Sequence, residues 1–238
     1  MHSCLSPCAD LQMVPPEIVE RMVEKGITII GICDHNSCEN AASFISAGNK
    51  RDIVVFPGIE VTTREEVHIL GLFGALNDAM KLQELIYGNL SGVNDEEAFG
   101  VQAVVDEQGN PIAINERLLI GATNLPVENV VDAIHSFRGV CIASHIDRES
   151  FSIIGQLGFI PEDLRLDAIE LSPRVKREEY SKWQMAYSGV PILCSSDAHF
   201  LDDVGKCSTA FWLVEATFDE FKKALRGEGE SRIIDWLA

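Results

Sequence analysis

The chain has 238 residues, of which 46% are hydrophobic, and this size suits one α/β barrel domain of about 250 residues. It carries 37 acidic and 19 basic residues, so its net charge of −18 should repel phosphate backbones and anionic lipid. We therefore expect no general nucleic-acid surface and no membrane surface. A small phosphorylated substrate can still bind, because divalent cations reverse the field inside a single pocket.

Neither a signal peptide nor a membrane span is expected. No basic segment leads into an apolar run at the N-terminus, and no stretch of about 18 apolar residues occurs. The predicted location is cytoplasmic. The cysteine count is seven, and Cys33, Cys141 and Cys194 lie inside apolar runs. This pattern predicts reduced, buried thiols rather than a disulfide framework.

The first part of the chain predicts alternating helices and strands. Pro15 and Pro16 open a helix to about Lys25, and Gly26 ends it. The run from Ile27 to Cys33 is apolar without alternation, as in a strand that is buried on both faces. The next predicted elements are a helix over about 38–48, a strand over 53–56 that is followed by the segment 58–63, and a strand over 67–73 that pairs with this segment through the turn at 64–66.

The pattern weakens between residues 77 and 126. A helix over about 78–87 is predicted, but turn clusters at 88–92 and 106–111 interrupt the rest. We interpret this stretch as a helical and loop excursion beside the barrel. After it, we predict helices over 126–137, 160–165, 178–188 and 218–226, and strands over 140–144, 167–171, 191–195 and 209–214.

Polar side chains follow several of the predicted strands. Asp34 and His35 end the first one, His145 follows the strand over 140–144, and Asp197 and His199 follow the strand over 191–195. Residues two apart on an extended segment point to the same side, so Asp197 and His199 should face one cavity. The C-terminal ends of parallel strands share one face, where α/β proteins build active sites. A single site is therefore predicted.

Seven residues are candidate metal ligands, and all offer nitrogen or oxygen donors: His2, His35, Glu60, His68, His145, Asp197 and His199. This set is too large for one tetrahedral zinc. It suits two or three divalent ions bridged by Glu60, an arrangement that clamps the attacking and leaving oxygens in phosphoryl displacement. Manganese, iron and zinc all fit mixed imidazole and carboxylate donors.

The order of these motifs resembles the PHP (polymerase and histidinol phosphatase) superfamily. The matching pieces span almost the whole chain and are His2-Ser3, Cys33-Asp34-His35-Asn36, Pro57-Gly58-Ile59-Glu60-Val61-Thr62, Val67-His68-Ile69-Leu70-Gly71, Ala143-Ser144-His145 and Ser196-Asp197-Ala198-His199. The resemblance implies one domain over residues 1–238 with a distorted (β/α)7 TIM-like barrel. It also implies hydrolysis of a phosphomonoester of a small molecule or nucleotide by a metal-bound hydroxide.

The resemblance further implies how the ligands divide among the ions. His2, Glu60 and Asp197 would hold one metal, Glu60 would bridge to a second that His68 and His145 hold, and His35 and His199 would hold a third. Asp34 is assigned to the catalytic residues, because it resembles an acidic residue of the family that does not bind metal itself. That residue orients the imidazole of a metal ligand.

Two departures from the family pattern concern the N-terminus. The family begins with a strand that ends in His-x-His, and Met1 occupies the middle position here, so we expect a truncated or mis-assigned start and an exposed barrel edge. Pro7 and Cys8 occupy positions where the family usually has a further Asp or His ligand. Cys8 as a thiolate, or Asp10 after a loop shift, could substitute.

Several residues and the function itself keep alternative interpretations. Arg148 is either a surface charge or a bidentate clamp on a phosphate. His68 could be a core histidine, and His135 is interpreted as an ordinary helix residue. The alternatives to a phosphomonoesterase are a nuclease that acts on short oligonucleotides and a non-catalytic, metal-bound interaction module.

Overall fold

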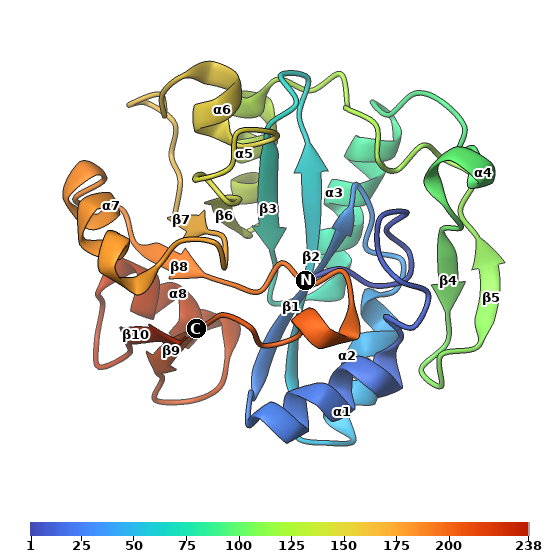
Figure 1. Cartoon of the computed structure of the whole chain (residues 1–238), viewed down its shortest axis with the longest axis horizontal. Helices are drawn as coiled ribbons and strands as arrows, with labels where there is room; N and C mark the ends of the chain where they lie inside the picture. Colours follow the sequence, from blue (N-terminus) through green and yellow to red (C-terminus); the bar gives the residue numbers. More distant parts are fainter. Residues whose placement is uncertain (238) are drawn as a thin grey trace.

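A curled six-stranded sheet, in the order β1-β2-β3-β6-β7-β8, forms the centre of the computed structural model, which describes residues 1–237 (Figure 1). All of its strands run in the same direction except β3, which is antiparallel to both of its neighbours. The strands are β1 (Ile29–His35), β2 (Val54–Thr62), β3 (His68–Leu72), β6 (Val140–Ala143), β7 (Ala168–Leu171) and β8 (Ile192–Cys194).

The sheet is open between β1 and β8, which are its two edge strands. The predicted mixed α/β architecture is confirmed, but the described residues place six strands in this sheet, so the seven-stranded barrel is not confirmed. Met1 lies in the opening. Its amino group donates to the Gly31 oxygen at 3.1 Å, and the Cys33 N–H donates to its carbonyl at 2.9 Å. The N–H of His2 donates to the Ala198 oxygen at 3.0 Å, so this short segment bridges both edges.

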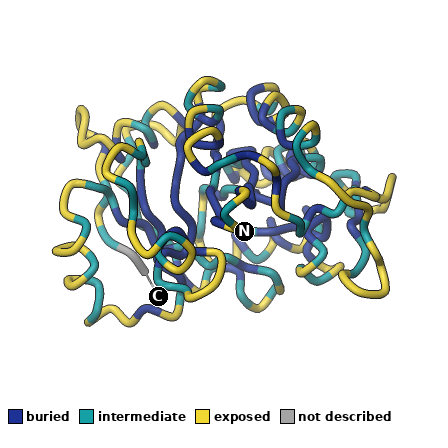
Figure 2. The backbone as a smooth tube through the Cα atoms, turned by 90° about the horizontal axis from the view of Figure 1, so that it is seen from above, coloured by how far each residue is buried: buried dark blue, intermediate teal, exposed yellow. Residues whose placement is uncertain are grey.

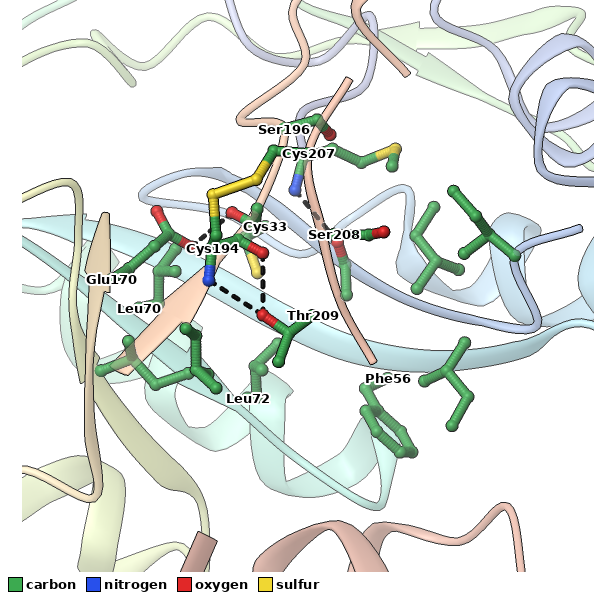
Figure 3. Close-up of a pocket in the computed structure, with 18 of the residues that line it drawn as sticks. Cys33, Phe56, Leu70, Leu72, Glu170, Cys194, Ser196, Cys207, Ser208 and Thr209 are labelled. Atoms are coloured by element: carbon green, nitrogen blue, oxygen red, sulfur yellow. Dashed lines mark hydrogen bonds between the residues drawn. A yellow bond between two sulfur atoms is a disulfide. The ribbon is translucent and has the colours of Figure 1, made fainter. Parts of the chain in front are cut away.

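An apolar cavity of about 190 Å³ lies between the edge strands, and Met1 is one of the residues that line it. Figure 3 shows this cavity. Phe56, Leu72 and Leu193 contribute to its lining. On one side, β9 (Ser208–Trp212) runs beside β8, and the Thr209 hydroxyl donates to the Cys194 oxygen and accepts from the Cys194 N–H, both at 2.9 Å. A side chain therefore satisfies the backbone at the end of this edge strand.

Cys194 and Cys207 form a disulfide with their Cα atoms 6.0 Å apart (Figure 3). The prediction of a reduced thiol at Cys194 is therefore wrong, whereas Cys33 and Cys141 are free and buried as predicted. The apolar run around Cys194 indicates its burial correctly. The sequence does not show that the chain returns to this point 13 residues later.

Helices cover the outside of the sheet (Figure 1). The largest apolar cluster includes Leu82 and Ile86 of α3, Val130 and Ile134 of α5, and Ile69 of β3, all fully buried. The helices are α1 (Pro15–Lys25), α2 (Ala41–Asn49), α3 (Leu76–Tyr87), α4 (Glu96–Phe99), α5 (Val127–Ser136), α6 (Ile153–Leu157), α7 (Tyr180–Ala186) and α8 (Phe218–Arg226), with short 3-10 turns at Arg177–Glu179 and Leu201–Asp203.

Local signals explain the helix ends that the sequence predicted. Proline begins α1, and Gly26 ends it in the left-handed conformation with φ 66°. The Thr217 side chain caps the first turn of α8 by accepting from the Glu220 N–H. The helix predicted over 160–165 is wrong, because the helical turn of that connection lies earlier, in α6. None of the helices in residues 1–237 has the length and apolar character that a bilayer crossing requires.

The excursion after α3 contains a β-hairpin that the sequence did not predict. Its strands are β4 (Ala103–Val105) and β5 (Pro111–Ile114), and with α4 they lie to one side of the main sheet (Figure 1). The buried Asn40 holds the hairpin, because its amide donates to the Ala103 oxygen and accepts from the Val105 N–H. A third unpredicted strand, β10 (Arg232–Leu237), pairs antiparallel with β9.

Candidate metal centre

The carboxylate of Glu60 lies at the centre of the candidate site, among four imidazoles. Its Oε1 is 3.3 Å from Nδ1 of His68 and 3.5 Å from Nε2 of His145. Its Oε2 is 3.1 Å from Nε2 of His2 and 3.4 Å from Nδ1 of His35. Each oxygen therefore faces its own pair of histidines, as a carboxylate that bridges two cations would.

The strand directions bring these residues to one edge of the sheet. His35 ends β1 and lies in register with Glu60 of β2. Because β3 is antiparallel, its first residue, His68, lies at the edge where the parallel strands end. His145 follows β6, and the segment that carries Asp197 follows β8. Figure 2 shows that buried backbone occupies the interior of the molecule and exposed backbone lies mainly at its periphery. The five candidate ligands before Asp197 are at most 7% exposed.

Asp197, His199 and Arg148 complete the cluster. One carboxylate oxygen of Asp197 is 3.2 Å from Nε2 of His2, and the other accepts from the guanidinium of Arg148 at 2.7 Å. His199 stacks on the His2 ring with centroids 4.1 Å apart. Its Nδ1 lies 2.8 Å from the Asp197 carbonyl oxygen, which can only accept, so Nδ1 carries the proton and Nε2 has a free lone pair.

Among the described residues, the candidate ligands form three overlapping groups of three residues. Within each group, the ligand atoms all lie within 4.8 Å of one another. One group, formed by His2, Glu60 and Asp197, is the set that the resemblance implied for the first metal. His35 belongs to two groups, because it lies near His2 and His199 and also near Glu60 and His68. The groups are His2, Glu60 and Asp197; His35, Glu60 and His68; and His2, His35 and His199.

Asp34 orients an imidazole indirectly. It is fully buried and accepts from the Ser3 N–H at 2.6 Å, from the Ser3 hydroxyl at 2.7 Å and from the Ser6 hydroxyl at 2.8 Å. Because the Ser6 hydroxyl donates to Asp34, it accepts from Nδ1 of His2, 2.9 Å away. Asp34, which we expect to orient a ligand imidazole from behind the ligands, thus reaches His2 through Ser6. Sequence reasoning missed the role of Ser6. The only hint in the sequence is that Ser6 lies four residues after His2.

The ionisation of the cluster favours neutral imidazoles at two positions. Burial and the neighbouring His2 hold the pKa of His35 well below its ordinary value, and the same causes lower the pKa of His199 to about 4. Burial opposes a charge on His2, but hydrogen bonds to Asp197 and Glu60 outweigh it and raise its pKa to about 9. The pKa of Glu60 is well below its usual range, because the surrounding histidines outweigh burial.

The residues present fit bound cations. Nδ1 of His35, His68 and His145 is buried and has no hydrogen-bond partner, although buried polar atoms are normally paired. In His35 and His68 this unpaired nitrogen faces the Glu60 carboxylate, and imidazole nitrogens beside a carboxylate are what divalent ions require. The backbone also adopts positive φ at His145 (30°) and Asp197 (43°), the kind of strain that clusters at functional sites.

Cys8 and Asp10 are not part of these ligand groups. The Asp10 carboxylate accepts from the Gln12 N–H at 2.7 Å, and the Asp10 N–H donates to the His199 oxygen at 2.8 Å. Asp10 therefore closes the N-terminal loop over His199. His135, which was interpreted as an ordinary helix residue, lies outside the cluster and pairs with Asp167 at 3.0 Å.

Comparisons with known proteins show a family through one family model and a fold through solved structures. The family model for the PHP domain matches residues 1–227. No curated protein matches the chain. A lesion-specific endonuclease from Pyrococcus furiosus, PfuEndoQ, has a similar structure with a TM-score of 0.74 and 19% identity, over 98% of this chain and 56% of that one. This chain thus spans about half the length of that enzyme.

Two further structures share the fold. An Endonuclease Q in complex with a 27-mer duplex substrate that carries an abasic lesion at the active site has a TM-score of 0.69 and 18% identity, over 98% of this chain and 56% of that one. A proposed metal-dependent phosphoesterase from Bifidobacterium adolescentis has a TM-score of 0.57 and 14% identity, over 96% of this chain and 95% of that one.

Proposed function

Because the chain belongs to the PHP domain family, we propose that it is a metal-dependent phosphoesterase that hydrolyses a phosphomonoester of a small molecule or nucleotide. The observation that carries this proposal is the carboxylate of Glu60, which has two imidazoles against each oxygen. When bound, two or three manganese, iron or zinc ions would supply an activated water and neutralise charge on the phosphate. The seven candidate ligands are proposed to hold them.

Arg148 is proposed to bind the phosphate. Its side chain is 27% exposed, and one terminal nitrogen pairs with Asp197. Its Nε is buried and has no hydrogen-bond partner. A guanidinium donates through five N–H groups, so Arg148 can hold Asp197 and still donate to phosphate oxygens.

Asp34 is proposed as a positioning residue. Its hydrogen bond from Ser6 fixes the proton of His2 on Nδ1 and turns Nε2 toward Glu60 and Asp197. Loss of this contact should weaken metal binding at His2 without removing a ligand.

A nuclease is the second candidate function. It is supported by the fold that this chain shares, over 98% of its length, with two endonuclease structures. The net charge of −18 opposes it, because nucleic-acid affinity depends on neutralising phosphates with basic residues.

Turnover of phosphomonoesters, nucleotides and short oligonucleotides with added manganese tests both candidates. We expect the wild type to hydrolyse a monoester and Glu60→Gln to lose more than about 100-fold in kcat/KM, beyond the loss for disturbing a supporting residue. His135→Gln, which alters a histidine outside the cluster, should retain wild-type activity. Cleavage of oligonucleotides alone would favour the nuclease. No turnover despite bound metal would favour a non-catalytic interaction module.

A further inference from the structure

Phe151 is an exposed aromatic residue beside the candidate metal centre. It lies in the loop between β6 and α6, and 42% of its surface is exposed. Its ring stacks on His68 with centroids 4.8 Å apart and an angle of 18° between the planes. His68 in turn lies 3.3 Å from Glu60. The exposed part of the Phe151 ring therefore lies one imidazole away from the centre of the cluster.

The backbone of Phe151 is in an unfavourable conformation. Its φ is 59°, which is an outlier for a bulky side chain that lacks a local polar group. The carbonyl of Phe151 accepts from the His68 N–H at 2.8 Å, and this bond ties the loop to β3. Strain of this kind persists only where the surroundings enforce it, and an observed outlier supports a functional hypothesis.

The loop is braced, so the ring has a defined position. The Ser152 hydroxyl donates to the Arg148 oxygen at 2.5 Å and accepts from the Gly155 N–H at 2.9 Å. Gly155 is required here, because a Cβ at this position would lie 2.3 Å from the Glu149 oxygen. A rigid aromatic surface loses little conformational freedom when it binds a ligand.

We propose that Phe151 is a specificity-determining residue that stacks against the nucleobase of a phosphorylated substrate, either a nucleoside monophosphate or the end of an oligonucleotide. This inference rests on the proposed phosphoesterase site. The same loop carries Arg148, which is proposed to bind the phosphate, and Phe151, whose exposed ring can stack on a flat base, so the pair matches the two chemical parts of a nucleotide. Stacking on an aromatic side chain tolerates every base, because each base has a π-face.

Binding by the manganese-loaded protein, measured by calorimetry, tests the proposal without requiring turnover. The probes are adenosine 5′-monophosphate, ribose 5-phosphate, which lacks the base, and a 5′-phosphorylated tetradeoxyadenylate. We expect Phe151→Leu to weaken binding of adenosine 5′-monophosphate by roughly 5- to 150-fold, the range of base stacking, and to change ribose 5-phosphate by less than about twofold. Phe151→Trp, which keeps an aromatic ring, should bind adenosine 5′-monophosphate more tightly than ribose 5-phosphate, as the wild type does.

Phe99→Leu is the matched control, because Phe99 is 45% exposed and belongs to α4 in the excursion. It should change neither affinity. Metal content is measured for each variant, because Phe151 also covers His68. Equal weakening of the two small probes by Phe151→Leu would overturn the proposal and show a purely structural role. Tighter binding of the oligonucleotide than of the monophosphate identifies the polymer as the source of the base.

The proposed function and this inference fail separately. If neither these probes nor the wider set of phosphomonoesters is hydrolysed, the phosphoesterase is rejected, whereas the affinity ratio between adenosine 5′-monophosphate and ribose 5-phosphate still decides the role of Phe151. If both are hydrolysed and bound equally well by the wild type, the phosphoesterase stands and the stacking role is rejected.

Discussion

Glu170 is a buried carboxylate on β7 that the proposed chemistry does not use. The Ser195 hydroxyl donates to it at 2.5 Å. Burial raises the pKa of Glu170, the Asp197 carboxylate raises it further, and the Ser195 hydrogen bond only partly offsets these effects. In the metal-free protein, the ionised form of Glu170 is therefore less stable in the folded state than in the unfolded chain.

Because the pKa of Glu170 is raised, we predict that Glu170→Gln increases the stability of the fold by an amount that depends on pH. The folded pKa is raised, so the penalty is absent below the unfolded pKa near 4.3, grows between that value and the folded pKa, and is complete above the folded pKa. Glutamine keeps an acceptor for Ser195 and removes the charge. We expect the variant to melt roughly 2–4 °C higher at pH 8, the shift that about 1 kcal/mol produces in a chain of this size, and to match the wild type near pH 4.

Thermal unfolding of the metal-free protein at both pH values measures this difference. Glu84→Gln removes the same charge from the exposed surface of α3 and serves as the control. An identical gain at pH 4 and pH 8 would show that packing, rather than ionisation, changes the stability.

At the scale of elements, the disulfide closes the loop between β8 and β9. Cys194 ends β8, Cys207 precedes β9, and the 12 residues between them include Asp197 and His199. The cross-link limits the conformations of this segment in the unfolded chain. Two of the seven candidate ligands therefore lie on a covalently closed loop.

We predict that Cys207→Ser lowers the free energy of unfolding of the oxidised protein by about 3 kcal/mol, as expected for a closed loop of this length. Denaturant titration with and without a reductant measures the change. Reductant should destabilise the wild type and leave Cys207→Ser unaffected. Cys8→Ser, at a free and exposed thiol, should behave like the wild type. Seven reactive thiols in the protein denatured without reductant would contradict this prediction.

At the scale of the whole molecule, bound cations would link distant parts of the chain. The candidate ligands run from His2 to His199, and at the cluster they join both edge strands of an open sheet. Any ligand that binds the folded state alone stabilises it. The net charge of −18 adds a second effect, because every cation also reduces self-repulsion.

We predict that manganese at about 100 times its dissociation constant stabilises the fold by about 2.7 kcal/mol and raises the melting temperature by roughly 5–10 °C. Differential scanning calorimetry measures the shift, and sodium chloride at equal ionic strength separates screening from site binding. Glu60→Gln should lose most of the manganese effect and keep the sodium effect. Equal shifts for the two salts in the wild type would count against a specific centre.

The sequence by itself determined the strands of the central sheet, most helices and the polar residues at the strand ends, but not β4, β5 or β10. Unbroken apolar runs predict buried strands. Proline, glycine and cap residues predict where helices begin and end, to within one or two helical turns. These signals are local, so they can be read without knowing the fold. The direction of parallel strands then predicts that residues such as His35 and Asp197 meet at one edge.

Only the tertiary structure decided which atoms meet there. Contacts between segments far apart in the sequence leave no periodic signal, and several of them set the chemistry of the site. The two oxygens of Glu60 divide four imidazoles between them, Asp34 reaches His2 through Ser6, and Phe151 stacks on His68. The disulfide of Cys194 is another contact that only the tertiary structure decides. The burial of Cys194 can be inferred from its neighbours in the sequence, whereas its partner in space depends on the path of the whole backbone.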